Sequence, residues 1–138
     1  MRTVLPIDDP GDTPKPLTQD LDDPTPSIAA VRDWARDSLS DLDADVVEDV
    51  VLVVNELVSN AFDHGRASRQ VRLHRSSNPC SIRVEVEDAS LDAPVLGVSR
   101  LNAGRGRGLI IVARLAKDWG VVPQPAGKTV WAEISCVP

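Results

Sequence analysis

The chain has 138 residues, a formal net charge of −6 and a hydrophobic fraction of 42%. These values fit one globular domain with a core of its own, and the negative charge argues against general nucleic-acid binding. No apolar run approaches the roughly 20 residues that cross a bilayer, and the first ten residues hold no signal-peptide core, so we expect neither membrane insertion nor secretion.

Two residue types bear on compartment and source. Cys80 and Cys136 lack the spacing of metal ligands, so we expect reduced thiols in a cytoplasmic protein. Arginine outnumbers lysine by 12 to 3, a bias typical of high-GC bacterial genomes.

The N-terminal segment differs from the rest of the chain. Residues 1–26 hold six of the 11 prolines and six acidic residues, and we expect an acidic, proline-rich tail without stable structure. Ser27 is a good N-cap, and apolar residues recur behind it at helical spacing. This pattern predicts a helix over 28–39 and a folded domain over 27–138.

A second helix is predicted ahead of Gly65. Its apolar residues recur at helical spacing and would form one broad stripe: Val47, Val50, Val51, Val54, Leu57, Val58 and Ala61. The run 50–54 is β-branched and fits a buried strand by propensity. Two observations favour the helix. Acidic residues cluster near its start, where the helix dipole favours negative charge, and the helical period continues to Ala61.

A hairpin is predicted behind this helix. Residues 69–75 and 81–88 alternate between polar and apolar side chains, and a turn at 76–79 joins them. The stretch 89–107 has no clear period, and such long loops in small domains are often functional.

The last part of the chain reads as a helix and two strands. An apolar helix is predicted over 108–118, and strands over 119–122 and 129–134 follow it. The order of elements predicts an α+β fold, a two-layer sandwich with helices on one face of a mostly antiparallel sheet.

The second helix carries the first group of residues that could have a chemical role. Glu56 and Asn60 lie four residues apart, so they project side by side, and His64 continues the row. A carboxylate and an amide one turn apart suit Mg²⁺, which binds few protein oxygens and keeps its waters. Taken alone, the stretch fits a solvated polar helix face better.

A glycine-rich run stands immediately before the third predicted helix. Its glycines let backbone N–H groups approach a ligand, and a helix N-terminus favours anions. Arg105 and Arg107 add positive charge there, so the run suits a polyphosphate. It lacks the Gly-Lys-Ser/Thr of a Walker A loop, and it does not directly follow a strand, as a dinucleotide fingerprint would. A hinge without a ligand fits the run equally well.

Asp88 stands at the end of a predicted strand. It fits a turn residue that caps the next backbone groups. A buried carboxylate there would need a hydrogen-bond donor, and an adenine amino group is one such donor.

These three groups, in this order, resemble the N-box, G1-box and G2-box of the ATP-binding fold shared by gyrase, histidine kinases and MutL. The chain is similar to one branch of it, the small bacterial anti-sigma regulators that are serine protein kinases. The N-box of that branch, Glu-x-x-x-Asn-Ala-x-x-His-Gly, is matched by Glu56, Asn60, Ala61, His64 and Gly65. Its G2-box, Gly-x-Gly-Leu, is matched by Gly106, Gly108 and Leu109. The resemblance covers roughly residues 26–136.

The resemblance implies a Bergerat-type fold with ATP and Mg²⁺ as cofactors. Asn60 would hold Mg²⁺, and Glu56 would be the general base toward the attacking hydroxyl. Asp88 would bind the adenine amino group, and Thr129, which matches a late threonine of the family, would help through water. For His64, a phosphate contact and a polar helix end fit equally well.

The resemblance also assigns the glycine-rich run to an ATP lid. The residues that would form its hinge and floor are Gly104, Arg105, Gly106, Arg107, Gly108 and Leu109. The chain departs from the family after Asp88, where many members read Asp-x-Gly-x-Gly and this chain continues Ala89-Ser90-Leu91-Asp92. The expected lid, 91–103, is also short and lacks aromatic residues.

We therefore expect an ATP- and Mg²⁺-dependent serine/threonine protein kinase of the anti-sigma type. It would phosphorylate a small anti-sigma antagonist of the STAS type and would also bind a sigma factor, and a homodimer is a further implied state. The alternative is a non-catalytic ATP-binding module that sequesters a partner. Glu56 favours the kinase, and the altered G1-box favours the module. A histidine-kinase fragment is disfavoured, because no helix pair carries a phosphoacceptor histidine.

Overall fold

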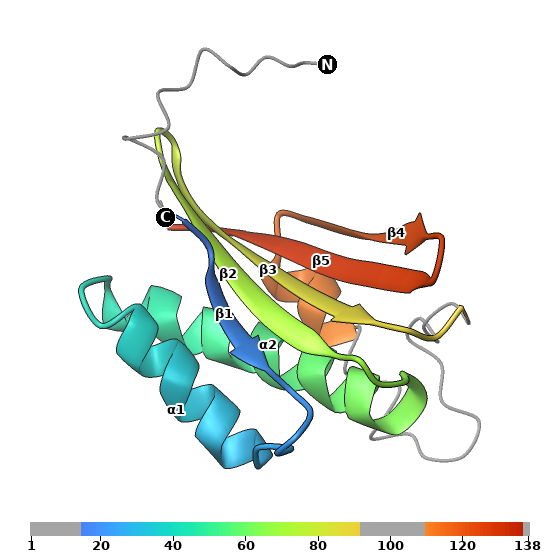
Figure 1. The fold of residues 1–138 in the computed structure, drawn as a ribbon. Coiled ribbons are helices and arrows are strands. Elements are labelled where there is room, and N and C mark those ends of the chain that lie inside the picture. The colour runs from blue at the N-terminus through green and yellow to red at the C-terminus, as the bar shows by residue number, and fades with distance from the viewer. Residues whose placement is uncertain (1–14, 92–109, 137–138) are drawn as a thin grey trace.

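The computed structural model describes residues 15–91 and 110–136. The helices and strands in chain order are β1 (Leu17–Asp20), α1 (Ile28–Ser38), α2 (Ala44–His64), β2 (Gln70–Ser77), β3 (Cys80–Asp88), β4 (Asp118–Gln124) and β5 (Gly127–Ser135). Residues 110–115 are helical as well. Figure 1 shows α1 and α2 side by side on one face of a twisted sheet. The predicted α+β two-layer sandwich is confirmed.

Both predicted N-terminal helices form where the pattern placed them. The Ser27 hydroxyl caps α1 by accepting a hydrogen bond from the backbone N–H of Ala30 at 3.0 Å. The β-branched run 50–54 lies inside α2, because its helical stripe buries eight side chains: Val47, Val50, Val51, Val53, Val54, Leu57, Val58 and Ala61. Nowhere in the described ranges does a helix combine the length and apolar character needed to cross a membrane.

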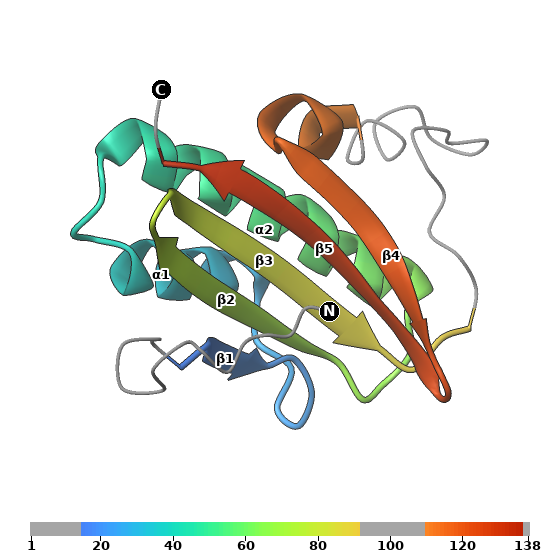
Figure 2. The same ribbon diagram turned by 90° about the horizontal axis from the view of Figure 1, so that it is seen from above.

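The sheet brings the ends of three elements together. Its strand order is β1-β2-β3-β5-β4, and every neighbouring pair is antiparallel. The rows of β3 and β5 that face the helices are apolar and buried: Ile82, Val84, Val86, Val130, Ala132 and Ile134. In Figure 2 the end of β3, the start of β5 and the end of α2 lie at the same end of the sandwich. This is the end at which a site could form.

The opposite face of the sheet is polar and self-paired. Glu85, on β3, is contacted by Arg72, His74 and Arg83. Burial raises the pKa of Glu85, but the hydrogen bonds from Arg83, His74 and Arg72 outweigh it and lower the pKa to about 2. The Arg83 guanidinium also stacks on the ring of Trp131 at 4.1 Å. These contacts keep that face separate from the apolar core.

The strand β1 corrects the expected tail over 1–26. Leu17–Asp20 pairs with β2, and Leu21, directly behind it, is fully buried. Asp22 then forms an ion pair with Arg69 at 2.7 Å. The sequence pattern did not predict this strand, because the strand is short and polar. It joins the sheet through backbone hydrogen bonds. Residues 1–14 lie outside the described part of the chain, so the tail stays a prediction for them.

The membership of this segment in the fold can be tested by stability. We expect Leu21→Ala to lower the free energy of unfolding by about 2–5 kcal/mol, because it empties a buried leucine site. Leu17→Ala is the matched control; it removes a side chain that is 40% exposed and should cost much less. Urea unfolding followed by circular dichroism measures both values. Equal losses in the two variants would contradict a buried role for Leu21.

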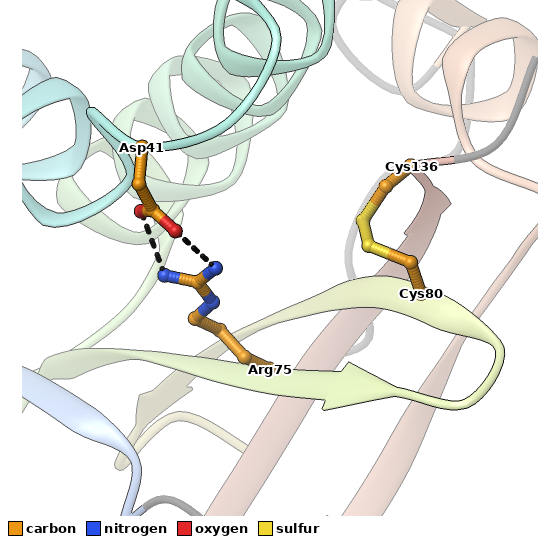
Figure 3. The surroundings of a disulfide bond; sticks show 4 residues. All are labelled: Asp41, Arg75, Cys80 and Cys136. Atoms are coloured by element: carbon orange, nitrogen blue, oxygen red, sulfur yellow. Dashed lines mark hydrogen bonds and ion pairs between the residues drawn. A yellow bond between two sulfur atoms is a disulfide. The ribbon is translucent and has the colours of Figure 1, made fainter.

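The cysteines also correct an expectation. Cys80 and Cys136 form a disulfide and are not free thiols (Figure 3). The pairing of Ser81 with Ser135 in the β3–β5 ladder brings the neighbouring cysteines together, although they lie 56 residues apart in sequence. The disulfide closes the end of the sheet opposite the candidate site, since Cys80 begins β3 and Asp88 ends it.

We expect reduction of this disulfide to lower the free energy of unfolding by about 2–4 kcal/mol. The disulfide closes a long loop in the unfolded chain, and its reduction raises the conformational entropy of the unfolded state. Urea unfolding with and without dithiothreitol measures the difference. The double variant Cys80→Ser, Cys136→Ser should unfold at the same urea concentration in both buffers. If dithiothreitol did not change the urea concentration at which the wild type unfolds, a stabilising disulfide would be ruled out.

Candidate functional site

A small hollow lies between the second half of α2 and the strands β3 and β5. Its lining consists of Leu57, Asn60, Ala61 and His64 from the helix, and Val86, Asp88, Lys128 and Val130 from the strands. Its free space is about 10 Å³, enough for about one water molecule. The hollow therefore combines an apolar lining with a few polar groups, and it is closed to larger ligands in this conformation.

Asp88 forms the buried polar end of the hollow. Strand alternation places it in the same row as Val84 and Val86, so its side chain faces the helices and is only 3% exposed. Its Oδ1 accepts hydrogen bonds from the backbone N–H groups of Ser90 at 2.6 Å and Arg66 at 3.4 Å. The expectation that a buried carboxylate here needs donors is met in this way by the backbone.

Lys128 is the residue that sequence reasoning missed. It pairs with Asp88 in the β3–β5 ladder, and its side chain is buried in the same hollow. Its Nζ lies 3.1 Å from Oδ2 of Asp88 and 3.2 Å from Oδ1. A signal was present in the sequence, because Lys128 continues the alternating row of Val130 and Ala132 and so belongs to the core face.

Thr129 is the residue expected to help Asp88. It is the neighbour of Lys128 on β5, so strand alternation directs its side chain to the other face of the sheet. There its hydroxyl accepts a hydrogen bond from Gln124 at 3.4 Å. The geometry therefore does not support the expected role of Thr129 in adenine binding beside Asp88, and this role stays a prediction.

Polar residues of α2 form the rim of the hollow. Asn60 is half-buried, and in the described part of the chain its side-chain amide has no hydrogen-bond partner. His64, at the end of the helix, is exposed. Glu56 lies one turn before Asn60 in the same row, and its carboxylate accepts a hydrogen bond from Asn55 at 3.0 Å.

A short polar chain continues from Glu56 to the first helix. The Oδ1 of Asn55 accepts a hydrogen bond from Arg32 on α1 at 3.1 Å. The carboxylate of Glu56 is thus held by an amide that is itself held by a guanidinium. Such a chain restricts the orientation of the carboxylate before any ligand arrives.

The residues of the hollow fit one part of an ATP–Mg²⁺ site and leave another part closed. Within the described ranges, no group of three or more histidine, cysteine, aspartate or glutamate side chains could hold a metal ion. A single amide such as Asn60 is nevertheless enough for Mg²⁺ when phosphates and water supply the other ligands. The position expected for adenine is different, because Lys128 already contacts the Asp88 carboxylate there. The expected lid residues 104–109 lie outside the described part of the chain.

Two glycines allow the backbone to pass close to Asp88. A Cβ on Gly65 would lie 2.6 Å from the carbonyl oxygen of Ala61 and 2.8 Å from Cγ of Asp88. A Cβ on Gly127 would lie 2.1 Å from the carbonyl oxygen of Asp88. The glycine that ends the N-box match therefore has a packing reason, which is to let the helix end against the aspartate.

We expect Gly65→Ala to lower the free energy of unfolding by about 1–3 kcal/mol, because the new methyl group overpacks the contact with Asp88. His64→Ala is the control from the preceding, exposed position and should change stability by less than about 0.5 kcal/mol. Thermal and urea unfolding measure both variants. A Gly65→Ala protein as stable as the wild type would show that this close approach does not exist.

Comparison with known proteins agrees with the geometry. The sequence model of the histidine kinase-like ATPase domain matches residues 8–134. No curated protein matches the chain.

Two solved structures share the fold. The first contains the RsbU and RsbW domains of Rv1364c from Mycobacterium tuberculosis, with a TM-score of 0.63, 20% identity and 88% of this chain covered. The second is a blue-light activated histidine kinase from Erythrobacter litoralis, EL346, with a TM-score of 0.53, 26% identity and 70% covered. The chain spans 32% of the length of each of these proteins. This chain matches one part of each solved protein, and each of the two contains further sequence that this chain does not match.

Proposed function

We infer the function from one premise: the chain belongs to the family of histidine kinase-like ATPase domains, whose model matches residues 8–134. The resemblance to this superfamily that the sequence motifs suggested is confirmed. We propose that the chain binds ATP with Mg²⁺ and acts as a serine/threonine protein kinase of the anti-sigma regulatory type.

One observation carries this proposal. Along α2, the row Glu56, Asn60 and His64 leads from a held carboxylate to the rim of a hollow that ends in the buried Asp88. A nucleotide with its base at Asp88 and its phosphates toward Asn60 would lie along this row. Phosphoryl transfer depends chiefly on positioning and charge neutralisation, so a few fixed polar groups are sufficient.

Three residues of the site have a definite task in the proposed reaction: Asp88, Asn60 and Glu56. Asp88 would accept a hydrogen bond from the adenine amino group. The Oδ1 of Asn60 would be the protein ligand of Mg²⁺, which when bound supplies positive charge next to the phosphates. Glu56 would accept the proton of the attacking serine hydroxyl, with Asn55 keeping its carboxylate in place.

The proposed substrate is a small anti-sigma antagonist of the STAS type, and a sigma factor is the second proposed partner. The fold similarity to the chain that holds the RsbU and RsbW domains of Rv1364c supports a regulatory setting of this kind. The N-box match from Glu56 to Gly65 supports the same branch. A homodimer and a cytoplasmic location belong to the same proposal.

A second candidate is a module that sequesters its partner without catalysis. One observation favours it, namely the ion pair between Lys128 and Asp88, which occupies the adenine end of the hollow. Glu56 favours the kinase, because a binding module has no use for a held carboxylate next to the metal ligand. The two candidates differ in whether a phosphoryl group leaves ATP.

We expect Glu56→Gln to lower the rate of phosphate transfer about 10²- to 10⁴-fold, since it removes the base and keeps the shape of the side chain. The ATP dissociation constant should stay within about threefold of the wild type, because uniform binding is unchanged. Transfer of ³²P from ATP to STAS-type proteins of the same bacterium, and calorimetry of Mg²⁺–ATP, measure the two quantities.

Asp45→Asn is the matched control for Glu56→Gln, because it removes one carboxylate from the exposed first turn of the same helix. It should leave both quantities unchanged. Asn60→Ala should lose Mg²⁺-dependent ATP binding. Full transfer activity in Glu56→Gln would contradict the role of the base, and nucleotide binding without any transfer in the wild type would favour the sequestering module.

A further inference from the structure

We propose that Lys128 gates the nucleotide site: its ammonium group holds the Asp88 carboxylate when no nucleotide is bound, and adenine reaches that carboxylate only by displacing it. This inference rests on the proposed ATP binding and adds the residue that sets its strength. It gives the buried lysine a role that neither the motifs nor the fold assign to it.

The hydrogen bonds of Asp88 show which oxygen is at stake. Oδ1 already accepts from the backbone N–H groups of Ser90 and Arg66, at 2.6 and 3.4 Å. Oδ2 lies 3.1 Å from Nζ of Lys128, and the same Nζ donates to Oδ1 at 3.2 Å. The ammonium group thus contacts both oxygens of the carboxylate, and because both backbone donors are on Oδ1, Oδ2 is the oxygen that a ligand would reach once the ammonium withdraws. Lys128 therefore holds the oxygen that an adenine amino group would use.

The available space points to the same conclusion. The hollow in front of Asp88 has about 10 Å³ of free space, which is about one water molecule and far below typical ligand pockets of roughly 300–1,000 Å³. Lys128 is 6% exposed and is one of the side chains that fill the region. Withdrawal of this side chain would add room in front of Asp88.

The position of Lys128 in the fold gives it a route out. It is the second residue of β5 and follows a two-residue turn at 125–126, which is exposed. A lysine stem has four flexible bonds, and its ammonium is strongly hydrated, so it can exchange a buried carboxylate for water at the end of a strand. Asp88 by contrast is fixed, because it lies in the middle of backbone contacts to Arg66 and Ser90.

Competition of this kind has a measurable size. When a protein is competent to bind only while a side chain is displaced, its apparent dissociation constant rises by the inverse of the competent fraction. A lysine in place for about nine-tenths of the time raises it about tenfold. We therefore expect removal of the ammonium group to tighten Mg²⁺–ATP binding at least about tenfold.

Two substitutions separate charge from volume. Lys128→Met keeps a long side chain and removes the charge, whereas Lys128→Ala removes both. We expect Mg²⁺–ATP to bind tightest to Lys128→Ala, less tightly to Lys128→Met and weakest to the wild type. Lys117→Met is the matched control, since Lys117 is exposed and lies at the far end of the β4–β5 pair from Asp88. It should bind like the wild type. Titration calorimetry of the full chain measures all four dissociation constants.

A measurement on the wild type keeps the test decisive if a variant does not fold. With the lysine side chains labelled by ¹³C, the full chain gives three ε-carbon signals, from Lys15, Lys117 and Lys128. Addition of Mg²⁺–ATP should move the Lys128 signal to the position of the exposed lysines and leave the Lys117 signal in place. A Lys128 signal that stays unchanged while ATP binds would overturn the inference.

The outcomes separate this inference from the proposed function. Equal dissociation constants in the wild type and both Lys128 variants would overturn the gate and leave ATP binding intact. Weaker binding to Lys128→Ala would also overturn it and would make Lys128 a ligand of the nucleotide. No binding to any of the proteins would overturn both proposals. Binding to Lys128→Ala alone would support the gate and would contradict the proposed ATP binding by the wild type.

Discussion

The ion pair between Asp88 and Lys128 is the interaction on which the candidate site depends. The two residues lie opposite one another in the β3–β5 ladder, each at the polar end of an apolar row. A carboxylate or an ammonium buried alone costs several kcal/mol, so each group needs a partner in this position. The backbone contacts of Asp88 with Arg66 and Ser90 then bind the end of α2 to the end of β3. These contacts lie at the hollow, which Asp88 and Lys128 both line.

The row of polar residues on α2 has a different character. Glu56 is held by Asn55 and through it by Arg32, whereas the Asn60 amide has no partner in the described part of the chain. In the proposed reaction Glu56 is the base and Asn60 the metal ligand, and phosphoryl transfer depends chiefly on such fixed polar groups. At Asp88, where the proposal places adenine, Lys128 would have to move before a nucleotide could bind. Under the proposal, the phosphates would meet polar groups that are already in place, whereas the position of the adenine base is occupied by Lys128.

The sequence predicted the architecture well because periodicity decides it. The helical stripe of α2 outweighed the β-propensity of residues 50–54, and the alternation in β3 and β5 predicted which side chains face the core. For Asp88, the sequence left a turn residue and a buried carboxylate open, and the structure shows it buried. The family motif, however, pointed to Thr129 as the partner of Asp88. Which residue of β5 lies opposite Asp88 depends on the register of the two strands, and the motif does not specify that register. The same alternating row, continued by one residue, points to Lys128.

Two features lay beyond local pattern. The strand β1 is joined by backbone hydrogen bonds and by the burial of Leu21, and neither leaves a period in a stretch of four residues. The disulfide depends on the β3–β5 register, which places Cys80 beside Cys136 only when the sheet is complete. Both are contacts between distant parts of the chain, so composition and spacing could not reveal them.

The most direct test of the account is whether a nucleotide binds in the hollow that ends at Asp88. Backbone amide spectra of ¹⁵N-labelled wild-type protein, recorded with and without Mg²⁺–ATP, report this residue by residue. The account predicts that the amides of Gly65, Arg66 and Ser90 shift with ATP, and that Mg²⁺ alone leaves them in place. No shift at millimolar ATP, or shifts confined to another surface, would contradict it.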